Sequence, residues 1–173
     1  MPKYQKNLKK YLNDIAAKRP APGGGSAAAL SFCLGLALIE KAMNYSLNKS
    51  PSFNKEIFAL KKLRNNIAVY INKDGEIFEK FMKAQGRGKL YFLKQSNHLI
   101  QNLGNACIKS FCLVKKVESG IKKSIISDFY IGLYFVKLSL KACILNLKAN
   151  SRTLGKKDKH IAIFTNVLKG MDV

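Results

Sequence analysis

Apolar residues recur every three to four positions along most of this chain, and the strict alternation that is typical of strands is nearly absent. Short segments rich in Gly, Pro, Ser or Asn interrupt the helical period. The sequence therefore predicts an all-α fold. Because the helices are long and the connections short, we expect one domain over residues 1–173, an antiparallel bundle of about six helices. They are expected at residues 3–17, 26–48, 52–84, 90–118, 124–150 and 158–168.

The connection between the first two expected helices has an unusual sequence. Residues 20–25 read PAPGGG, and an alanine-rich run follows from Ser26. Proline and glycine are unfavourable inside a helix and alanine is favourable, so the loop leads directly to a helix N-terminus, with Ser26 as its N-cap. Free backbone N–H groups at such a junction suit an anion. We expect Gly23, Gly24 and Gly25 to let a ligand or a partner chain approach, and at least one of them to have a positive φ.

A carboxylate interrupts the apolar face of the helix expected at 52–84. Asp74 lies among the apolar residues of that face rather than opposite them. A carboxylate in such a place costs free energy unless it is paired or takes part in chemistry. Asp74 is therefore either a structural residue, held by a lysine or by the phenol of Tyr70, or a functional acid.

A stripe of small and amide-bearing residues follows the helix expected at 124–150. Asn146 and Asn150 are four residues apart and lie on the same side, and each offers a hydrogen-bond donor and an acceptor. This pattern suits a heterocyclic ligand. The alternative is a close helix contact sealed by amide hydrogen bonds, with Ser127 and Asp128 only capping the helix. The stripe comprises Asp128, Gly132, Ser139, Cys143, Asn146 and Asn150.

The chain is strongly basic, with a formal net charge of +21 that comes from 27 Lys and only 4 Arg against 10 acidic residues. Lys, Asn and Ile are abundant together while Arg is scarce, a bias typical of A+T-rich genomes. Proteins that bind nucleic acid use Arg more often, because its fork makes paired contacts to bases and phosphates. We therefore interpret the charge mainly as compositional bias and keep a polyanionic partner as the alternative.

No feature of the sequence indicates a membrane segment or a metal site. Residues 1–10 are rich in lysine, but the apolar region of a secretory signal does not follow them. The longest charge-free run, 20–39, contains too short a helical part to span a bilayer. The cysteines and histidines form no metal-ligand spacing. We therefore expect a cytoplasmic protein that needs no metal.

Several segments match one family pattern in the same order along the chain. Residues 20–26 are similar to a PTPGGGS signature, 42–44 to M-V-A-N, and 74–78 to D-A-E-A-F. Residues 126–128 resemble a Ser-Asp motif that opens a long helix, and 146–150 resemble N-V-R/K-I-N. On these segments the chain resembles the formiminotransferase-cyclodeaminase C-terminal family, which includes stand-alone methenyltetrahydrofolate cyclohydrolases.

The resemblance implies an all-helical, typically dimeric fold with a folate cleft, and one-carbon chemistry on tetrahydrofolate without a metal or redox cofactor. Either 5-formimino-tetrahydrofolate loses ammonia to give the 5,10-methenyl form, or the methenyl form is hydrolysed to 10-formyl-tetrahydrofolate. Asp74 is the first candidate for the catalytic carboxylate and Asp128 the second. The residues implied in substrate binding are Gly23, Gly24, Gly25, Ser26, Asn44, Ser127, Asn146, Lys148 and Asn150.

The sequence also bears on partners. Folates carry glutamate tails, and a lysine-rich rim suits a polyglutamylated substrate. An alanine-rich, charge-free helix beside a stripe of small residues favours a homodimer. Two other classes stay open. One is a helical interaction protein that has lost catalysis, because residues 122–124 and 129–130 depart from the family pattern. The other is a basic nucleic-acid-binding module, against which stand the scarcity of Arg and the absence of a helix-turn-helix or zinc pattern.

Overall fold

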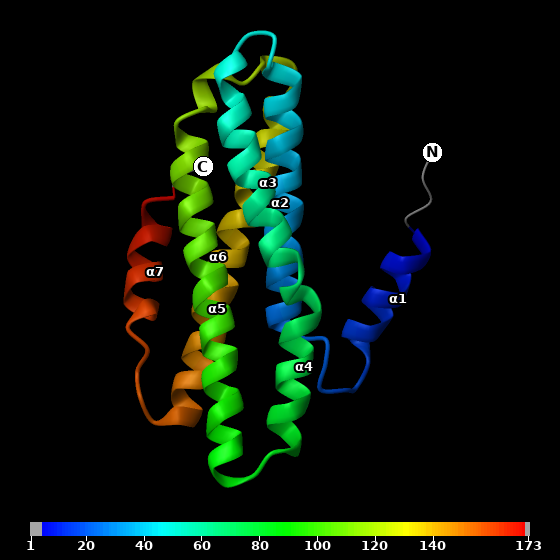
Figure 1. Ribbon diagram of the computed structural model, residues 1–173, viewed down its shortest axis with the longest axis vertical. Coiled ribbons are helices and arrows are strands. Elements are labelled where there is room, and N and C mark those ends of the chain that lie inside the picture. The colour runs from blue at the N-terminus through cyan, green and yellow to red at the C-terminus, as the bar shows by residue number, and fades with distance from the viewer. Residues whose placement is uncertain (1–4, 172–173) are drawn as a thin grey trace.

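The structure, a computed structural model, describes residues 5–171, and their side chains from residue 7 onward. Within this range it contains helices and no strand (Figure 1), which confirms the all-α prediction. The long helices are α2 (Gly24–Ser46), α3 (Asn54–Ala68), α4 (Tyr70–Lys83), α5 (Gly86–Lys115) and α6 (Ile126–Leu154). The shorter elements are α1 (Gln5–Ala16), α7 (His160–Lys169) and the 3-10 turns Pro51–Phe53, Glu118–Gly120 and Lys123–Ile125.

The long helices form the predicted antiparallel bundle. In Figure 1, α2 and α5 run upward, while α6 and the α3–α4 pair run downward between the same two ends. Helices α2 and α6 make the most extensive contact in the bundle, and α5 packs against both α6 and α4. Helix α7 covers the outer side of α6. The lower end of the bundle therefore brings the start of α2, the body of α4 and the last turns of α6 close together.

Small residues allow α2 and α6 to approach closely. A Cβ atom added to Gly35 would lie 2.7 Å from the carbonyl oxygen of Gly132, and one added to Gly132 would lie 2.7 Å from the carbonyl oxygen of Gly35. The hydroxyl of Ser139 is buried and donates a hydrogen bond to the carbonyl of Ala28 at 2.9 Å. Cys143 is also buried. The middle of the small-residue stripe is therefore a helix contact, the alternative that the sequence left open.

The helix expected at 52–84 is divided into two. Helix α3 ends at Ala68 and α4 begins at Tyr70, although Val69 between them keeps helical backbone angles of φ −65° and ψ −20°. The N–H of Val69 bonds the carbonyl of Ile67, only two residues back, so the regular α-helical hydrogen-bond pattern lapses there. Helix α4 consequently takes a direction of its own toward the lower end of the bundle (Figure 1).

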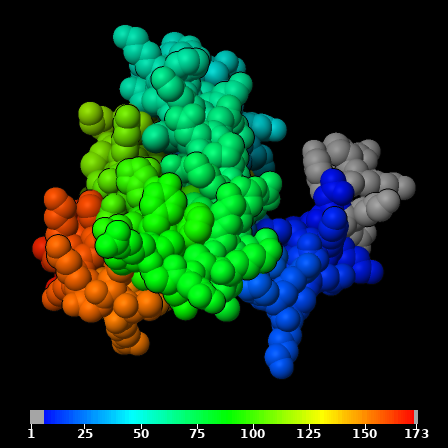
Figure 2. All heavy atoms as spheres, turned by 60° about the horizontal axis from the view of Figure 1, so that its bottom comes forward, coloured from blue at the N-terminus to red at the C-terminus, as the bar shows by residue number. Residues whose placement is uncertain are grey.

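Helix α1 stands out from the body of the bundle beside α4 (Figures 1 and 2). Three of its apolar side chains, Leu8, Leu12 and Ile15, are exposed. The loop that follows α1 leads back to the first turn of α2. Helix α1 therefore packs little on the bundle but lies next to the glycine-rich loop.

Two segments are long and apolar enough to cross a membrane, Gly24–Ser46 and Lys123–Leu154. Core helices of soluble proteins meet the same criterion, and these segments contain α2 and α6, the central pair of the bundle. In the bundle, 61% of the apolar window of the first segment and 44% of that of the second are buried. Their exposed parts carry the large apolar side chains of Leu34, Tyr45, Ile131, Tyr134, Leu138 and Leu145.

Candidate functional site

The glycine-rich loop leads directly to a helix N-terminus, as predicted, but the capping residue is different. Helix α2 begins at Gly24, and its N-cap, Gly23, has extended backbone angles and no side chain that could cap the helix. The N–H of Ser26 instead donates a hydrogen bond to Oδ2 of Asp74 at 3.0 Å. The prediction that Ser26 is the N-cap is therefore wrong, because a carboxylate from α4 takes that role.

Gly25 makes this approach of Asp74 possible. A Cβ atom added to Gly25 would lie 2.2 Å from Oδ1 of Asp74 and 2.5 Å from its Cγ, far inside van der Waals contact. Among the described residues only Gly86 and Gly155 have positive φ. The prediction of a positive φ within the glycine loop is therefore wrong, since Gly25 is required there for space and not for an unusual backbone conformation.

Asp74 is a partly buried carboxyl without a cationic partner. Burial raises its pKa, and the hydrogen bond from the N–H of Ser26 opposes that rise. Among the ion pairs of the described residues none includes Asp74, and no hydrogen bond joins it to Tyr70. The structural partners that the sequence suggested for Asp74 are therefore not the ones present. A carboxyl whose burial raises its pKa is a candidate for general acid or base catalysis.

The hydroxyl of Ser26 links the same turn to two other elements. It is buried, and it donates a hydrogen bond to the carbonyl of Ile71 at 2.6 Å. The phenol oxygen of Tyr11, from α1, lies 2.9 Å from Ser26 Oγ. The first turn of α2 is therefore held by α4 through Asp74 and Ile71, and by α1 through Tyr11.

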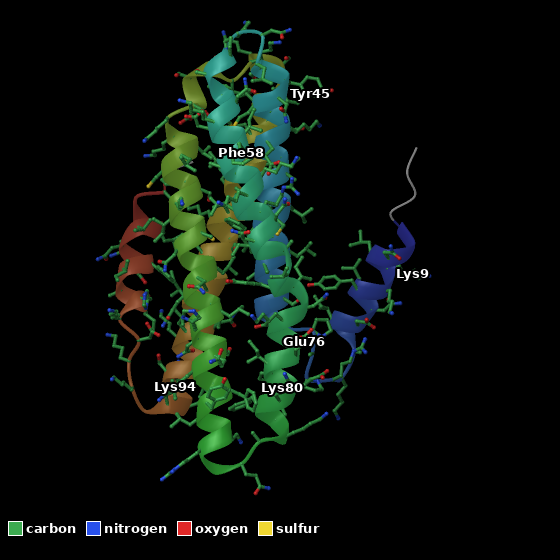
Figure 3. The ribbon with its side chains drawn as sticks, in the orientation of Figure 1. Lys9, Tyr45, Phe58, Glu76, Lys80 and Lys94 are labelled. Carbon is green, nitrogen blue, oxygen red and sulfur yellow. The ribbon has the colours of Figure 1, made fainter. Side chains whose placement is uncertain are left out.

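A pocket of about 240 Å³ lies between α1, the glycine loop and α4. Figure 3 places Glu76 on the side of α4 that faces α1. Asp14 and Glu79 also line this pocket, but Asp14 is paired with Arg19. The carboxyl groups of the pocket wall that have no ion-pair partner among the described residues are therefore those of Glu76 and Glu79. Such a wall attracts cations and repels anions. This side of the glycine loop is therefore less suited to a polyanionic ligand than the opposite side.

Asn146 lies over the opposite side of the glycine loop. A Cβ atom added to Gly24 would be 3.6 Å from Oδ1 of Asn146. One turn further along α6, the amide nitrogen of Asn150 donates a hydrogen bond to Oδ1 of Asn97 on α5 at 2.7 Å. Within residues 5–171 no hydrogen bond engages the side-chain amide of Asn146, whereas the amide of Asn150 is engaged by α5. The structure thus brings Asn146, the glycine loop and Asp74 together, with Asn150 at the edge of the same region.

A smaller apolar pocket of about 120 Å³ lies between α4, α5 and α6 beside Asn150. Phe78 and Phe81 form part of its wall and stack with ring centroids 5.8 Å apart. Ser96 contributes a hydroxyl to the same lining. Aromatic faces with a few polar groups are typical of sites for flat heterocycles. Sequence reasoning missed these residues because their helical spacing made both phenylalanines look like core.

Three of the remaining candidate residues, Asn44, Ser127 and Asp128, lie at the other end of the bundle. Asp128 forms an ion pair with Lys41 of α2 at 2.6 Å, and Asn44 and Ser127 are exposed near it. Since a helix rises about 1.5 Å per residue, Asp128 lies about 27 Å along α6 from Asn146. Within one chain, these three candidates are therefore not brought together with Asp74. Lys148, exposed on α6, lies at the glycine-loop end.

The described part of the chain contains no group of three or more His, Cys, Asp and Glu side chains placed to hold a metal ion. The chemistry that this site offers is accordingly that of a carboxyl group, backbone N–H groups, amides and aromatic faces. Such a set can bind a heterocycle, stabilise a cation and move a proton.

Comparison with known proteins identifies the family. The model of the formiminotransferase-cyclodeaminase family matches residues 7–163, nearly the whole chain. The chain belongs to the formiminotransferase-cyclodeaminase family. The match contains the glycine loop, Asp74 and both asparagines of α6, so the resemblance first seen in short segments is confirmed.

Two similar proteins extend this result. The methenyltetrahydrofolate cyclohydrolase of Methylorubrum extorquens is 25% identical over 166 residues, which cover 85% of this chain and 80% of that protein. The crystal structure of formiminotetrahydrofolate cyclodeaminase from Thermotoga maritima matches with a TM-score of 0.79 at 20% identity, over 95% of this chain and 85% of that chain. The second match shows that the two chains share a fold.

Proposed function

We propose that this chain is a folate one-carbon enzyme that hydrolyses 5,10-methenyl-tetrahydrofolate to 10-formyl-tetrahydrofolate. Family membership supports an enzyme of this kind, and the Methylorubrum relative carries the name of this activity. The observation that carries the proposal is the placement of Asp74, a partly buried carboxyl held against the first turn of α2 beside Asn146. The two alternatives, an interaction protein that has lost catalysis and a nucleic-acid-binding module, have less support, because neither function requires a partly buried carboxyl beside Asn146.

The proposed reaction adds water to the carbon that bridges N5 and N10. Water attacks this carbon and loses a proton, and the positive charge of the N–C–N system disappears in a tetrahedral intermediate. The bond from carbon to N5 then breaks while the hydroxyl of the intermediate loses its proton, N5 takes up a proton, and the formyl group stays on N10. The carboxylate of Asp74 would stabilise the cation and accept the proton of water. Burial, which raises the pKa of Asp74, matches it to this proton transfer.

A second candidate reaction is the loss of ammonia from 5-formimino-tetrahydrofolate. The fold match to the Thermotoga cyclodeaminase is the observation that favours it. In this reaction N10 attacks the formimino carbon and loses its proton, and the amino group leaves as ammonia after it is protonated. The intermediate is again a tetrahedral carbon between two nitrogens, so Asp74 would play the same part. Asp128 is the second candidate carboxylate for either reaction.

The substrate is proposed to lie on the side of the glycine loop that Asn146 covers. The amides of Asn146 and Asn150 would bind the polar edge of the pterin ring, and Phe78 and Phe81 would contact its face. The turn that begins α2 offers free backbone N–H groups at Gly24 and Gly25. Exposed lysines at this end include Lys80 and Lys94 (Figure 3) and Lys148, a setting that suits the glutamate tail of a folate.

We further propose that the protein is a homodimer in the cytoplasm and needs neither metal nor redox cofactor. The exposed apolar side chains of α2 and α6, such as Leu34 and Leu138, form a face that a second copy would cover. A two-fold axis across this face would bring Asn44 and Asp128 of one chain toward the glycine loop of the other. Sedimentation at micromolar concentration tests this proposal, and a monomer would contradict it.

One assay separates the proposed reactions. Purified protein is mixed with 5,10-methenyl-tetrahydrofolate in one arm and with 5-formimino-tetrahydrofolate in the other, and the absorbance of the methenyl form is followed. Its loss in the first arm, faster than in buffer, supports the cyclohydrolase. Its appearance in the second arm supports the cyclodeaminase. Absence of both, with the protein folded, would overturn the proposed function.

A further inference from the structure

The hydrogen bonds around Ser26 have a definite direction. Ser26 Oγ has one proton, and it donates this proton to the carbonyl of Ile71 at 2.6 Å. The proton in the 2.9 Å contact between Tyr11 and Ser26 must therefore come from the phenol of Tyr11. Ser26 thus accepts a hydrogen bond from α1 and donates one to α4.

The same residue also bonds Asp74. The backbone N–H of Ser26 donates to Oδ2 of Asp74 at 3.0 Å, and Ser26 itself is buried. A movement of Ser26 would therefore move the hydrogen-bond donor that orients Asp74. Because Gly25 leaves no space between the α2 backbone and Oδ1 of Asp74, the carboxyl has little freedom to follow by itself.

We propose that Tyr11 is a positioning residue for Asp74 and that it acts through Ser26. This inference rests on the proposed function, in which Asp74 is the catalytic carboxyl. With Tyr11 in place, the acceptor side of the Ser26 hydroxyl is filled and its proton is directed to Ile71. Without the phenol, the hydroxyl is free to turn, and the first turn of α2 loses one of the contacts that fix it.

The contact also ties α1 to the bundle. Between the described residues of α1 and the rest of the bundle, this is the one side-chain hydrogen bond in the structure. The exposed Leu8 and Leu12 show how little apolar packing supports it. The pocket of about 240 Å³ between α1 and α4 lies beside this contact. The attachment of α1 to the bundle therefore depends mainly on Tyr11, which contacts the turn that holds Asp74.

The first experiment compares Tyr11→Phe with Tyr91→Phe, a matched change at an exposed tyrosine of α5. Phenylalanine keeps the ring and removes only the hydroxyl. We expect Tyr11→Phe to lower kcat about tenfold and to change KM by less than about threefold, the scale of one lost hydrogen bond to a positioned group. Tyr91→Phe should keep both constants. Wild-type kcat in Tyr11→Phe, or a rise in KM alone, would overturn the proposal.

A double-mutant cycle tests whether Tyr11 acts through Ser26. Ser26→Ala removes the hydroxyl that accepts the hydrogen bond and leaves the backbone N–H for Asp74. In the Ser26→Ala background, the added change Tyr11→Phe should lower kcat by less than about twofold. An undiminished tenfold loss in that background would show that Tyr11 does not act through Ser26 and would reject the inference.

Limited trypsin digestion tests the contact without any folate. Lysines in or next to α1, such as Lys9, Lys10 and Lys18, offer cleavage sites. Tyr11→Phe should be cleaved there several-fold faster than wild type, and Tyr91→Phe at the wild-type rate. Equal rates would overturn the role of Tyr11. If wild-type protein turned over neither folate while digestion behaved as expected, the proposed function would fail and the tethering role of Tyr11 would stand.

Discussion

The close contact between Gly25 and Asp74 leads to a quantitative prediction for Gly25→Ala. The new Cβ would lie 2.2 Å from Oδ1, 2.5 Å from Cγ and 2.7 Å from Oδ2 of Asp74. Ordinary contact begins at 3.4 Å, so the carboxyl must move by about 1 Å or more. A shift of this size in a reacting group typically costs about 100-fold in rate. We therefore expect kcat of Gly25→Ala to fall about 100-fold.

The neighbouring glycines provide matched controls. A Cβ added to Gly23 meets nothing within 4 Å, and one added to Gly24 lies 3.6 Å from Asn146 Oδ1, an ordinary contact. Gly24 is the first residue of α2, whereas Gly23 is its N-cap, a position where alanine is less favourable than glycine. Both variants should therefore fold, Gly23→Ala with a slightly lower melting temperature than wild type, and both avoid the clash with Asp74.

The assay measures kcat and KM for all three alanine variants with 5,10-methenyl-tetrahydrofolate, together with their thermal melting. Gly25→Ala should melt as a folded protein and lose far more kcat than Gly23→Ala. If Gly25→Ala kept kcat within about threefold of wild type, the carboxyl would not need the position that the structure gives it.

Two further predictions concern single side chains of the site. Asn146→Ala should raise KM several-fold with little change in kcat, because Asn146 is proposed to bind ground and transition states alike, and an equal loss of kcat would contradict this role. Burial raises the pKa of Asp74 in the folded state. The contribution of Asp74 to the free energy of unfolding is therefore fully present below the pKa that Asp74 has in the unfolded chain, and it is lost as the pH rises through the pKa that Asp74 has in the folded chain. Lowering the pH from 7 to about 4 should therefore shift the melting-temperature difference between wild type and Asp74→Asn in favour of wild type, and the opposite shift would contradict the raised pKa.

The helical bundle could be predicted because the period of apolar residues in a helix is visible within a short stretch of sequence. The run after Ser26 contains apolar and small residues with the period of a helix, and breakers mark its start. The division at Val69 was not predictable, since its backbone angles remain helical and only the hydrogen-bond partner changes. For this reason the sequence predicted one helix at 52–84, whereas the structure has the two helices α3 and α4.

Asp74 could be singled out from the sequence because it interrupts an apolar face. Its partner could not, because the N–H of Ser26 lies 48 residues away and becomes a neighbour only when α4 packs on α2. The role of Gly25 depends on the same packing, which is why the approach of a ligand or partner chain was expected and not that of the Asp74 side chain. Phe78 and Phe81 looked like core for a similar reason, as periodicity cannot distinguish a pocket wall from an interior.

The separation of Asp128 from Asp74 was also beyond the sequence. Their motifs occur in family order, but order along a chain does not give distance in an antiparallel bundle. Asp128 lies near the start of α6 and Asn146 near its end, so one chain holds them at opposite ends. In the proposed homodimer, Asp128 of one chain would lie toward the glycine loop of the other chain.

The most direct test of the central claim is the turnover of 5,10-methenyl-tetrahydrofolate by wild type and by Asp74→Asn, measured side by side on proteins with matched melting curves. Asparagine keeps the size of the side chain and an oxygen that can accept the Ser26 hydrogen bond, but it cannot carry charge or transfer a proton. We expect wild-type turnover well above the rate in buffer and a kcat at least about 100-fold lower in Asp74→Asn. A folded Asp74→Asn variant with most of the wild-type kcat would contradict that claim.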